Sequence, residues 1–130
     1  MTTFSTDAGT ALFSSAISSI AAAATSSASS NYVDLGSATK CGLSITLTIT
    51  TGATASPVAQ IYCYGSNDHT TYDTDPCWSS DVQLIAANTT RTQSFIVQCP
   101  MRFFNVKVKN NDASQTITSV QVTAQVQTLA

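Results

Sequence analysis

The feature that most constrains this chain is a pair of alternating stretches near its C-terminus. In residues 102–109 and again in 118–126, apolar and polar side chains alternate along the chain. Such alternation places one set of side chains on a buried sheet face and the other set in water. The polar residues 110–112 suit the turn between two strands. Because one hairpin cannot bury its own apolar face, further strands must pack against it.

Further strand-like segments precede this hairpin. The clearest spans residues 43–50, where leucine and isoleucine alternate with serine and threonine. Shorter segments that end at turn signals are expected to form the remaining strands: 32–35, 57–64, 82–86 and 94–99. We therefore predict an all-β domain over residues 31–130, an antiparallel β-sandwich or jelly-roll-like fold of about seven or eight strands.

Residues 1–30 have a different pattern and are predicted to form an N-terminal arm. Their apolar side chains recur at helical spacing, while serine and alanine fill most positions between them. Because serine lowers helix propensity, a helix here would be stable only when docked, so the arm is expected to be helical or extended. The serine-rich run 25–30 is expected to be a flexible linker. One alternative is that the arm packs against its own domain. We favour contacts with a neighbouring subunit through these residues: Phe4, Leu12, Phe13, Ile17 and Ile20.

Charged residues make up only 9% of the 130-residue chain, against about 25% in an average protein. A surface so poor in charge lacks the repulsion that keeps monomers apart, so we expect a chain that works in an assembly. A soluble monomer with a threonine-rich surface remains the alternative. The net charge of −2 argues against a nucleic-acid partner, because phosphate binding requires a basic patch.

The sequence also bears on the compartment in which the chain is made. Its start lacks the basic region of a secretory signal peptide, and no apolar run reaches the roughly 20 residues that span a membrane. We therefore expect synthesis in a reducing cytoplasm and no membrane partner. The four cysteines, Cys41, Cys63, Cys77 and Cys99, stand too far apart for a typical zinc site. Buried thiols are favoured over two disulfides, but the sequence leaves their redox state open.

No constellation of catalytic or metal-binding residues stands out in the sequence. His69 is the only histidine, and three aspartates lie near it: Asp68, Asp73 and Asp75. Their spacing does not match a calcium loop, so turn formation is the better explanation. There is no nucleophile-elbow motif and no glycine-rich phosphate loop. We expect neither an enzyme nor a metal or cofactor site; a small hydrolase centred on His69 is the weakest alternative.

Aromatic side chains gather in and around a long polar loop in the middle of the chain. Tyr64, Tyr72 and Trp78 are candidates for contact with a carbohydrate or a protein, as exposed loop aromatics often are. Trp78 has a second interpretation, in which it covers one end of the core. Arg91 and Arg102 are candidate interface anchors, because arginine is enriched among the residues that dominate binding energy.

Three segments together resemble small structural proteins of tailed bacteriophages. They are residues 32–36 (YVDLG), 64–72 (YGSNDHTTY) and 102–112 (RFFNVKVKNND). The middle one looks like the S-x-D-G-x-x-Y turn of many phage virion β-sandwich proteins, with His69 in place of the glycine. The last resembles the strand and turn R-y-x-r-v-x-v-x-N-x-D near the C-terminus of such proteins. The likeness extends loosely over residues 31–126.

The resemblance implies a non-enzymatic virion component, in the first place a capsid decoration (cement) protein. Such a protein would bind the major capsid protein, or other virion proteins, on the capsid exterior after synthesis in the host cytoplasm. A homo-oligomer is expected, with a trimer favoured, and the N-terminal arm would bridge capsomers. The alternative is a tail-tip or fibre module that binds host surface glycan through Tyr64, Tyr72 and Trp78. No individual functional residue is carried over from the family.

Overall fold

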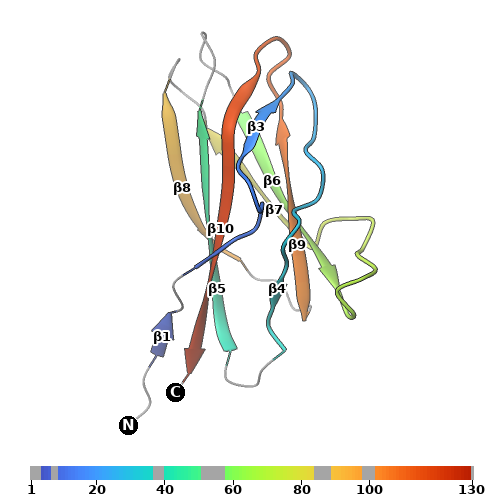
Figure 1. Cartoon of the computed structure of the whole chain (residues 1–130), viewed down its shortest axis with the longest axis vertical. Helices are drawn as coiled ribbons and strands as arrows, with labels where there is room; N and C mark the ends of the chain where they lie inside the picture. Colours follow the sequence, from blue (N-terminus) through green and yellow to red (C-terminus); the bar gives the residue numbers. More distant parts are fainter. Residues whose placement is uncertain are drawn as a thin grey trace.

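The computed structural model describes residues 4–6, 9–36, 40–50, 58–83, 89–97 and 102–129 of the chain. Within these ranges all regular structure is β, and the strands form two sheets. Most of the long strands run roughly along the longest axis of the molecule (Figure 1). The strands are β1 (Phe4–Thr6), β2 (Thr10–Ala11), β3 (Ile17–Ile20), β4 (Val33–Asp34), β5 (Lys40–Thr50), β6 (Val58–Ser66), β7 (Trp78–Gln83), β8 (Thr90–Ile96), β9 (Phe103–Asn110) and β10 (Ile117–Leu129). The all-β prediction is confirmed.

Two antiparallel sheets form the layers. In the six-stranded sheet the order is β8-β5-β10, and the short strands β1, β2 and β3 pair along the other side of β10. The four-stranded sheet has the order β4-β9-β6-β7. With β1 and β2 set aside, the order β3-β10-β5-β8 faces the order β4-β9-β6-β7, which is the pattern of two interlocked Greek keys. The predicted sandwich is therefore a jelly roll.

The core lies between the inward faces of the two sheets. Ile45, Leu47 and Ile49 of β5 are buried, as the alternation in this segment predicts. From the other sheet, β9 contributes the buried side chains of Val106 and Val108. Burial of each such side chain stabilises the fold by about 1.5–3 kcal/mol relative to an exposed one. The hydrophobic effect on these alternating positions thus fixes which face of each strand points inward.

Strand β10 departs from strict alternation near its start. Ile117 and Val120 are both buried, and the pairing with β5 shifts register between Thr118 and Gln121. Between them Ser119 has a φ of 54°, in the left-handed region that marks an irregular strand residue. The alternation predicted over residues 118–126 therefore begins only at Val120.

Residues 9–34 are part of the sandwich and do not form a separate arm. Leu12, Phe13 and Ile20 are 0%, 6% and 4% exposed and belong to the same buried cluster as the later strands, and Ile17 packs against that cluster. The expected helix is wrong, and the extended alternative holds: the segment contains β2 and β3, which pair with β10. The many serines lower the helix propensity of the segment despite its helical spacing, whereas the side of β10 offers backbone groups that need partners.

For three of the five predicted residues, these positions contradict a contact with a neighbouring subunit. Leu12, Phe13 and Ile20 fill the chain's own core, so their side chains are not available to a second molecule. The backbone of Phe4 pairs with Leu129, and its side chain lies outside the described residues. The boundary predicted at residue 30 therefore does not divide the core into two units.

The run expected as a flexible linker, residues 25–30, lies along the edge of β9. Ser26 donates its backbone N–H to the carbonyl of Val108 (2.8 Å), and its hydroxyl accepts the Val108 N–H (3.0 Å). Ser29 makes the same two bonds with Val106, at 2.9 and 3.0 Å. The linker prediction is therefore wrong, because these serine hydroxyls satisfy backbone groups of β9 that would otherwise form an open edge.

A candidate interaction site at one end of the sandwich

Three segments that lie far apart in the sequence meet at one end of the sandwich. The ring of Tyr32, just before β4, stacks on His69 in the β6–β7 loop, with ring centroids 4.8 Å apart. Both rings meet Phe103, at the start of β9, in edge-on contacts with centroids 5.5 and 5.0 Å apart. These three segments are the ones that carry the phage resemblance, so the fold joins them into one surface.

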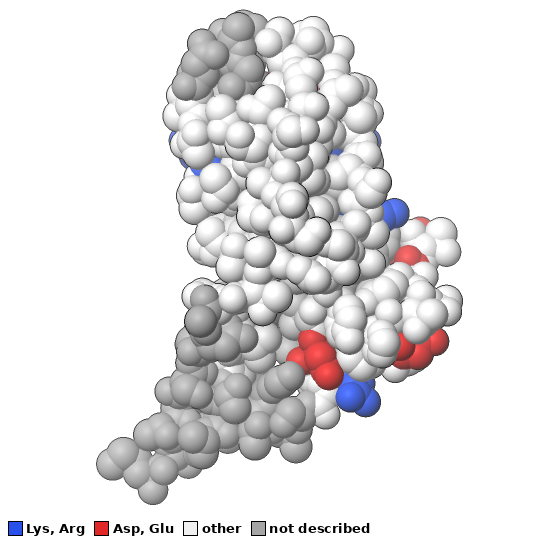
Figure 2. All heavy atoms as spheres, in the orientation of Figure 1, with Lys and Arg blue, Asp and Glu red and all other residues white. Residues whose placement is uncertain are grey.

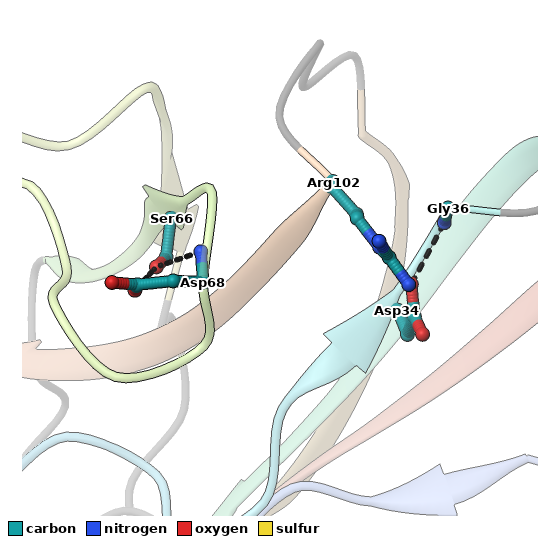
Figure 3. A network of polar contacts seen from close by, with 5 residues as sticks. All are labelled: Asp34, Gly36, Ser66, Asp68 and Arg102. Atoms are coloured by element: carbon teal, nitrogen blue, oxygen red, sulfur yellow. Dashed lines mark hydrogen bonds and ion pairs between the residues drawn. The ribbon is translucent and has the colours of Figure 1, made fainter.

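An ion pair holds the neighbouring backbone in place (Figure 3). Arg102 Nε donates to Asp34 Oδ1 at 3.2 Å, and the same oxygen accepts the Gly36 N–H at 2.8 Å. The Arg102 guanidinium carbon also lies 4.7 Å from the ring centroid of Phe103. A Cβ at Gly36 would collide with that guanidinium, so a larger residue here would displace the Arg102 side chain. We call these residues the end cluster: Tyr32, Asp34, His69, Arg102 and Phe103.

The turn that carries His69 is fixed by hydrogen bonds to one carboxylate. Asp68 Oδ1 accepts the backbone N–H groups of Thr71 (2.8 Å) and Thr70 (2.9 Å). It also accepts the hydroxyl of Ser66 at 3.0 Å (Figure 3). These bonds, first those from the N–H groups of Thr71 and Thr70, lower the pKa of Asp68 below its ordinary value of 3.8. The turn expected from the sequence is thus built around an ionised Asp68.

His69 has a φ of 51°, in the left-handed region that glycine adopts at the lowest cost. The phage turn that this segment resembles has glycine at the same place. The backbone strain of a non-glycine residue here is offset by the ring contacts that histidine makes with Tyr32 and Phe103. Histidine therefore extends the aromatic surface across a position that glycine would leave open.

The aromatic surface continues onto the outer face of the four-stranded sheet. Tyr62 and Tyr64 of β6 have ring centroids 6.5 Å apart, and Lys107 Nζ of β9 lies 4.8 Å from the Tyr64 ring centroid. Burial raises the pKa of Tyr64, and the nearby Tyr62 and Asp75 raise it further. Burial is also the first cause that raises the pKa of Tyr72, in the adjoining loop. These phenols are therefore neutral hydrogen-bonding groups at physiological pH.

The fold does not assemble the predicted contact of Tyr64, Tyr72 and Trp78. Trp78 begins β7 and packs against the core, with its ring edge-on to Phe95 of β8 at 5.7 Å. Its backbone partner in β6 is the buried Cys63, so Trp78 lies on the opposite face of the sheet from Tyr64. This placement agrees with the second interpretation, in which Trp78 covers the core. The predicted contact residues at or beside the end cluster are Tyr64, Tyr72 and Arg102.

Sequence reasoning missed several members of this surface. The signal for Lys107 was present, because alternation puts every second residue of β6 and β9 on one face and Lys107 stands opposite Tyr62. No such signal connected Tyr32 with His69, because their contact depends on how two loops fold. Asn105 was missed as well: it is buried, and its Oδ1 has no hydrogen-bond partner among the described residues.

The outer face of the six-stranded sheet has a different character. Hydroxyl groups bridge β5 and β8 in successive pairs: Thr46–Ser94 at 2.9 Å, Thr48–Thr92 at 3.3 Å and Thr50–Thr90 at 3.0 Å. The described side chains that point outward from β5, β8 and β10 include no charged group. Figure 2 shows a mostly uncharged surface, with charged atoms gathered beside the loop between β6 and β7. On the face shown, the acidic atoms therefore lie beside this loop.

Other chemical features are few in the described part of the chain. The residues described there include no group of His, Cys, Asp and Glu that could hold a metal ion. Cys63 is buried, and Cys77 Sγ donates to its carbonyl oxygen at 3.3 Å; the side chains of Cys41 and Cys99 lie outside the described residues. A groove of about 420 Å³ between residues 13–21 and 24–30 is lined mostly by serine and alanine. Among the residues described, no helix has the length and hydrophobicity that a membrane crossing requires.

Comparisons with known proteins bear on the fold. A chain in the structure of infectious bursal disease virus, Gx strain, matches 100% of this chain with a TM-score of 0.55 and 10% sequence identity, and this chain spans 32% of it. Dimeric latent PorU from Porphyromonas gingivalis gives a TM-score of 0.49 at 9% identity, over 98% of this chain and 13% of PorU. A chain from the disulfide-linked pili of Bacillus endospore appendages gives 0.39 at 11% identity, over 98% of this chain and 89% of that one.

The sequence itself has no such match: no protein-family model fits it, and no curated protein resembles it closely enough to count as a relative. At 10% identity, a structural likeness establishes a shared fold and leaves function to be argued from the residues. The chain is thus a jelly-roll domain whose fold matches about a third of a chain from a virus.

Proposed function

We propose that this chain is a non-enzymatic structural protein of a phage virion, bound to the outer surface of the capsid. The observation that carries the proposal is the jelly-roll topology, a fold that viral capsid proteins commonly use. Two further observations support it. The three phage-like segments meet in the end cluster, and the charge-poor surface suits a packed assembly.

The end cluster is the surface that we propose contacts the major capsid protein. Tyrosine and arginine dominate binding energy at many interfaces, and here Tyr32 is 42% exposed and the Arg102 side chain 56% exposed. The ion pair with Asp34 and the hydrogen-bonded turn hold these groups in place before binding, which lowers the entropy lost on binding. Many copies on one lattice would then stabilise the shell by mass action and avidity.

A pelleting experiment tests this function. Capsids prepared without the protein are mixed with the purified full chain, and bound protein is measured after sedimentation of the capsids. We expect the parent to bind, and Arg102→Ala to weaken binding by about tenfold or more. Thr123→Ala, on the uncharged face of the six-stranded sheet, is the matched control and should bind like the parent. The proposal fails if the parent does not bind, or if Arg102→Ala binds equally well.

A tail-tip or fibre module that binds host surface glycan is the second candidate. It is favoured by the neighbouring rings of Tyr62 and Tyr64 beside Lys107, since aromatic faces with polar groups at their rims suit sugar rings. On a glycan array, Tyr64→Ala should then abolish binding, whereas Thr123→Ala should leave it unchanged. Trp78→Ala is not a clean test, because Trp78 packs against the core. An array on which the parent binds no glycan removes this candidate.

A further inference from the structure

The outer edge of β8 is an unprotected side of the sandwich. The chain covers two other edges itself, with β1, β2 and β3 along β10 and with β4 and residues 24–29 along β9, while β7 is the outer strand of the four-stranded sheet. Among the described residues, β8 pairs with β5 alone, and Figure 1 shows it at the outer margin of the molecule. Natural edge strands are usually protected by lysine, proline or a bulge. β8 (TRTQSFI) contains no lysine, proline or bulge; its one charged residue is Arg91, which stands opposite the buried Ile49 of β5.

The side chains of β8 add a reason for this edge to be covered. Ile96 is 80% exposed, although large hydrophobic side chains in the described part of the chain are otherwise mostly buried. Phe95 is only partly buried and has one edge against Trp78. Exposed apolar groups on an open edge strand favour pairing with another strand.

We propose that β8 pairs with β8 of a second copy of this chain, antiparallel and centred on Gln93. The two six-stranded sheets would then form one continuous sheet across a twofold axis. In this register Thr90 lies opposite Ile96 of the second copy, Arg91 lies opposite Phe95, and Thr92 lies opposite Ser94. Gln93 lies opposite itself, on the axis.

Two of the pairs in this register are chemically complementary. Thr92 opposite Ser94 continues the hydroxyl ladder that already links β5 with β8. Arg91 opposite Phe95 places a cation beside an aromatic ring. A charge that points inward on an edge strand ordinarily discourages pairing with another strand. In this register the charge of Arg91 gains a partner, the Phe95 ring of the second copy. A shift of the register by two residues would separate Arg91 from Phe95, so the proposed register is the specific one.

Sedimentation velocity on the full chain tests the proposal through substitutions at Gln93. This side chain is exposed, so the variants should fold like the parent, which circular dichroism checks. Like charges directly opposite each other destabilise strand pairing. We therefore expect a dimer for the parent, and dimerisation weakened about five- to tenfold for Gln93→Lys alone and for Gln93→Glu alone.

An equal mixture of the two variants should restore the dimer, because lysine then faces glutamate across the axis. Gln125→Lys introduces the same charge on β10, in the middle of the sheet, and should leave the dimerisation constant unchanged. The proposal is overturned by a parent that stays monomeric or forms a trimer insensitive to Gln93→Lys. It is also overturned by a mixture that associates no better than either variant alone. None of these readouts involves capsids, so the dimer and the proposed capsid role stand or fall separately.

Discussion

Asn110, at the end of β9, connects three parts of the chain through one side chain. It is fully buried, and its Nδ2 donates to the carbonyls of Ile20 (3.2 Å), Ala21 (3.2 Å) and Gln115 (2.7 Å). Its Oδ1 accepts the N–H of Asp112 at 3.0 Å. The sequence indicated a turn residue here, but only the fold shows that this amide also holds the N-terminal segment.

Asn110→Asp should destabilise the protein, because a carboxylate would face three carbonyl oxygens with no donor to offer them. A buried group left without its hydrogen bonds costs about 1–3 kcal/mol, and more when it is charged, so we expect a loss of at least about 2 kcal/mol. Asn111→Asp adds the same charge at the neighbouring, half-buried position and is the control. Urea unfolding of both variants measures the difference. Equal midpoints would show that the Asn110 amide contributes little.

The turn around Asp68 should loosen in acid. Its folded-state pKa lies below the ordinary value of 3.8, so its contribution to stability is complete above that value. The contribution is lost as the pH falls through the lower, folded-state pKa. NMR titration should therefore show the Thr70 and Thr71 amide signals changing with a midpoint below pH 3.8, and Asp68→Asn should remove the transition. A transition at or above that pH would contradict the hydrogen-bonding account.

At the scale of whole elements, alternation predicted the central strands and failed at the edges. β5 and β9 are flanked by strands on both sides; burial alternates along Ser44–Thr50 of β5 and from Val106 to Asn110 of β9, whereas the first four residues of β9 are all buried. The edge strands β7 and β8 begin earlier than the expected segments 82–86 and 94–99. Because an edge strand buries little, its composition is free of the alternation that prediction needs.

The prediction that the serine-rich segment along β9 is a flexible linker is wrong for a related reason. Its composition is that of a linker, and its structural role depends on single hydroxyl groups placed opposite backbone N–H groups. Such contacts leave no periodic trace in the sequence. Local composition alone therefore gave no sign that this segment closes the edge of the sheet.

Ser29→Ala should destabilise the fold by about 1–3 kcal/mol, because the buried N–H of Val106 would lose its acceptor. Ser27→Ala changes an exposed serine in the same segment and should alter stability by less than about 0.5 kcal/mol. Thermal unfolding followed by calorimetry compares the two. If the variants unfold at the same temperature, the serine hydroxyls do not secure this edge.

Removal of residues 1–30 should leave a chain that no longer folds, since these residues supply part of the core and cover two edges. The single change Leu12→Ala tests the same claim more gently. Leu12 is fully buried, so its truncation should cost about 2–5 kcal/mol. Ser15→Ala, at an exposed position nearby, is the control. A truncated chain with the near-ultraviolet circular dichroism of the parent would restore the idea of a separate arm.

At the scale of the whole molecule, the surface divides into parts with different chemistry. One end gathers aromatic rings and the Arg102–Asp34 ion pair, the outer face of the six-stranded sheet is neutral and hydroxyl-rich, and β8 leaves an open edge. The low content of charged residues predicts the neutral surface. The end cluster could not be predicted in this way, because it is assembled from loops whose contacts are set only when both sheets have packed.

Cryo-electron microscopy of the virion that contains this chain tests the central claim most directly. We expect jelly-roll density on the outside of the capsid, with the loop between β6 and β7 and the side chains of Tyr32 and Arg102 facing the shell. We also expect residues 9–34 to be folded along β9 and β10 of the same subunit. Density confined to the tail, or a shell contact made by Leu12 and Phe13 reaching across to another subunit, would contradict it.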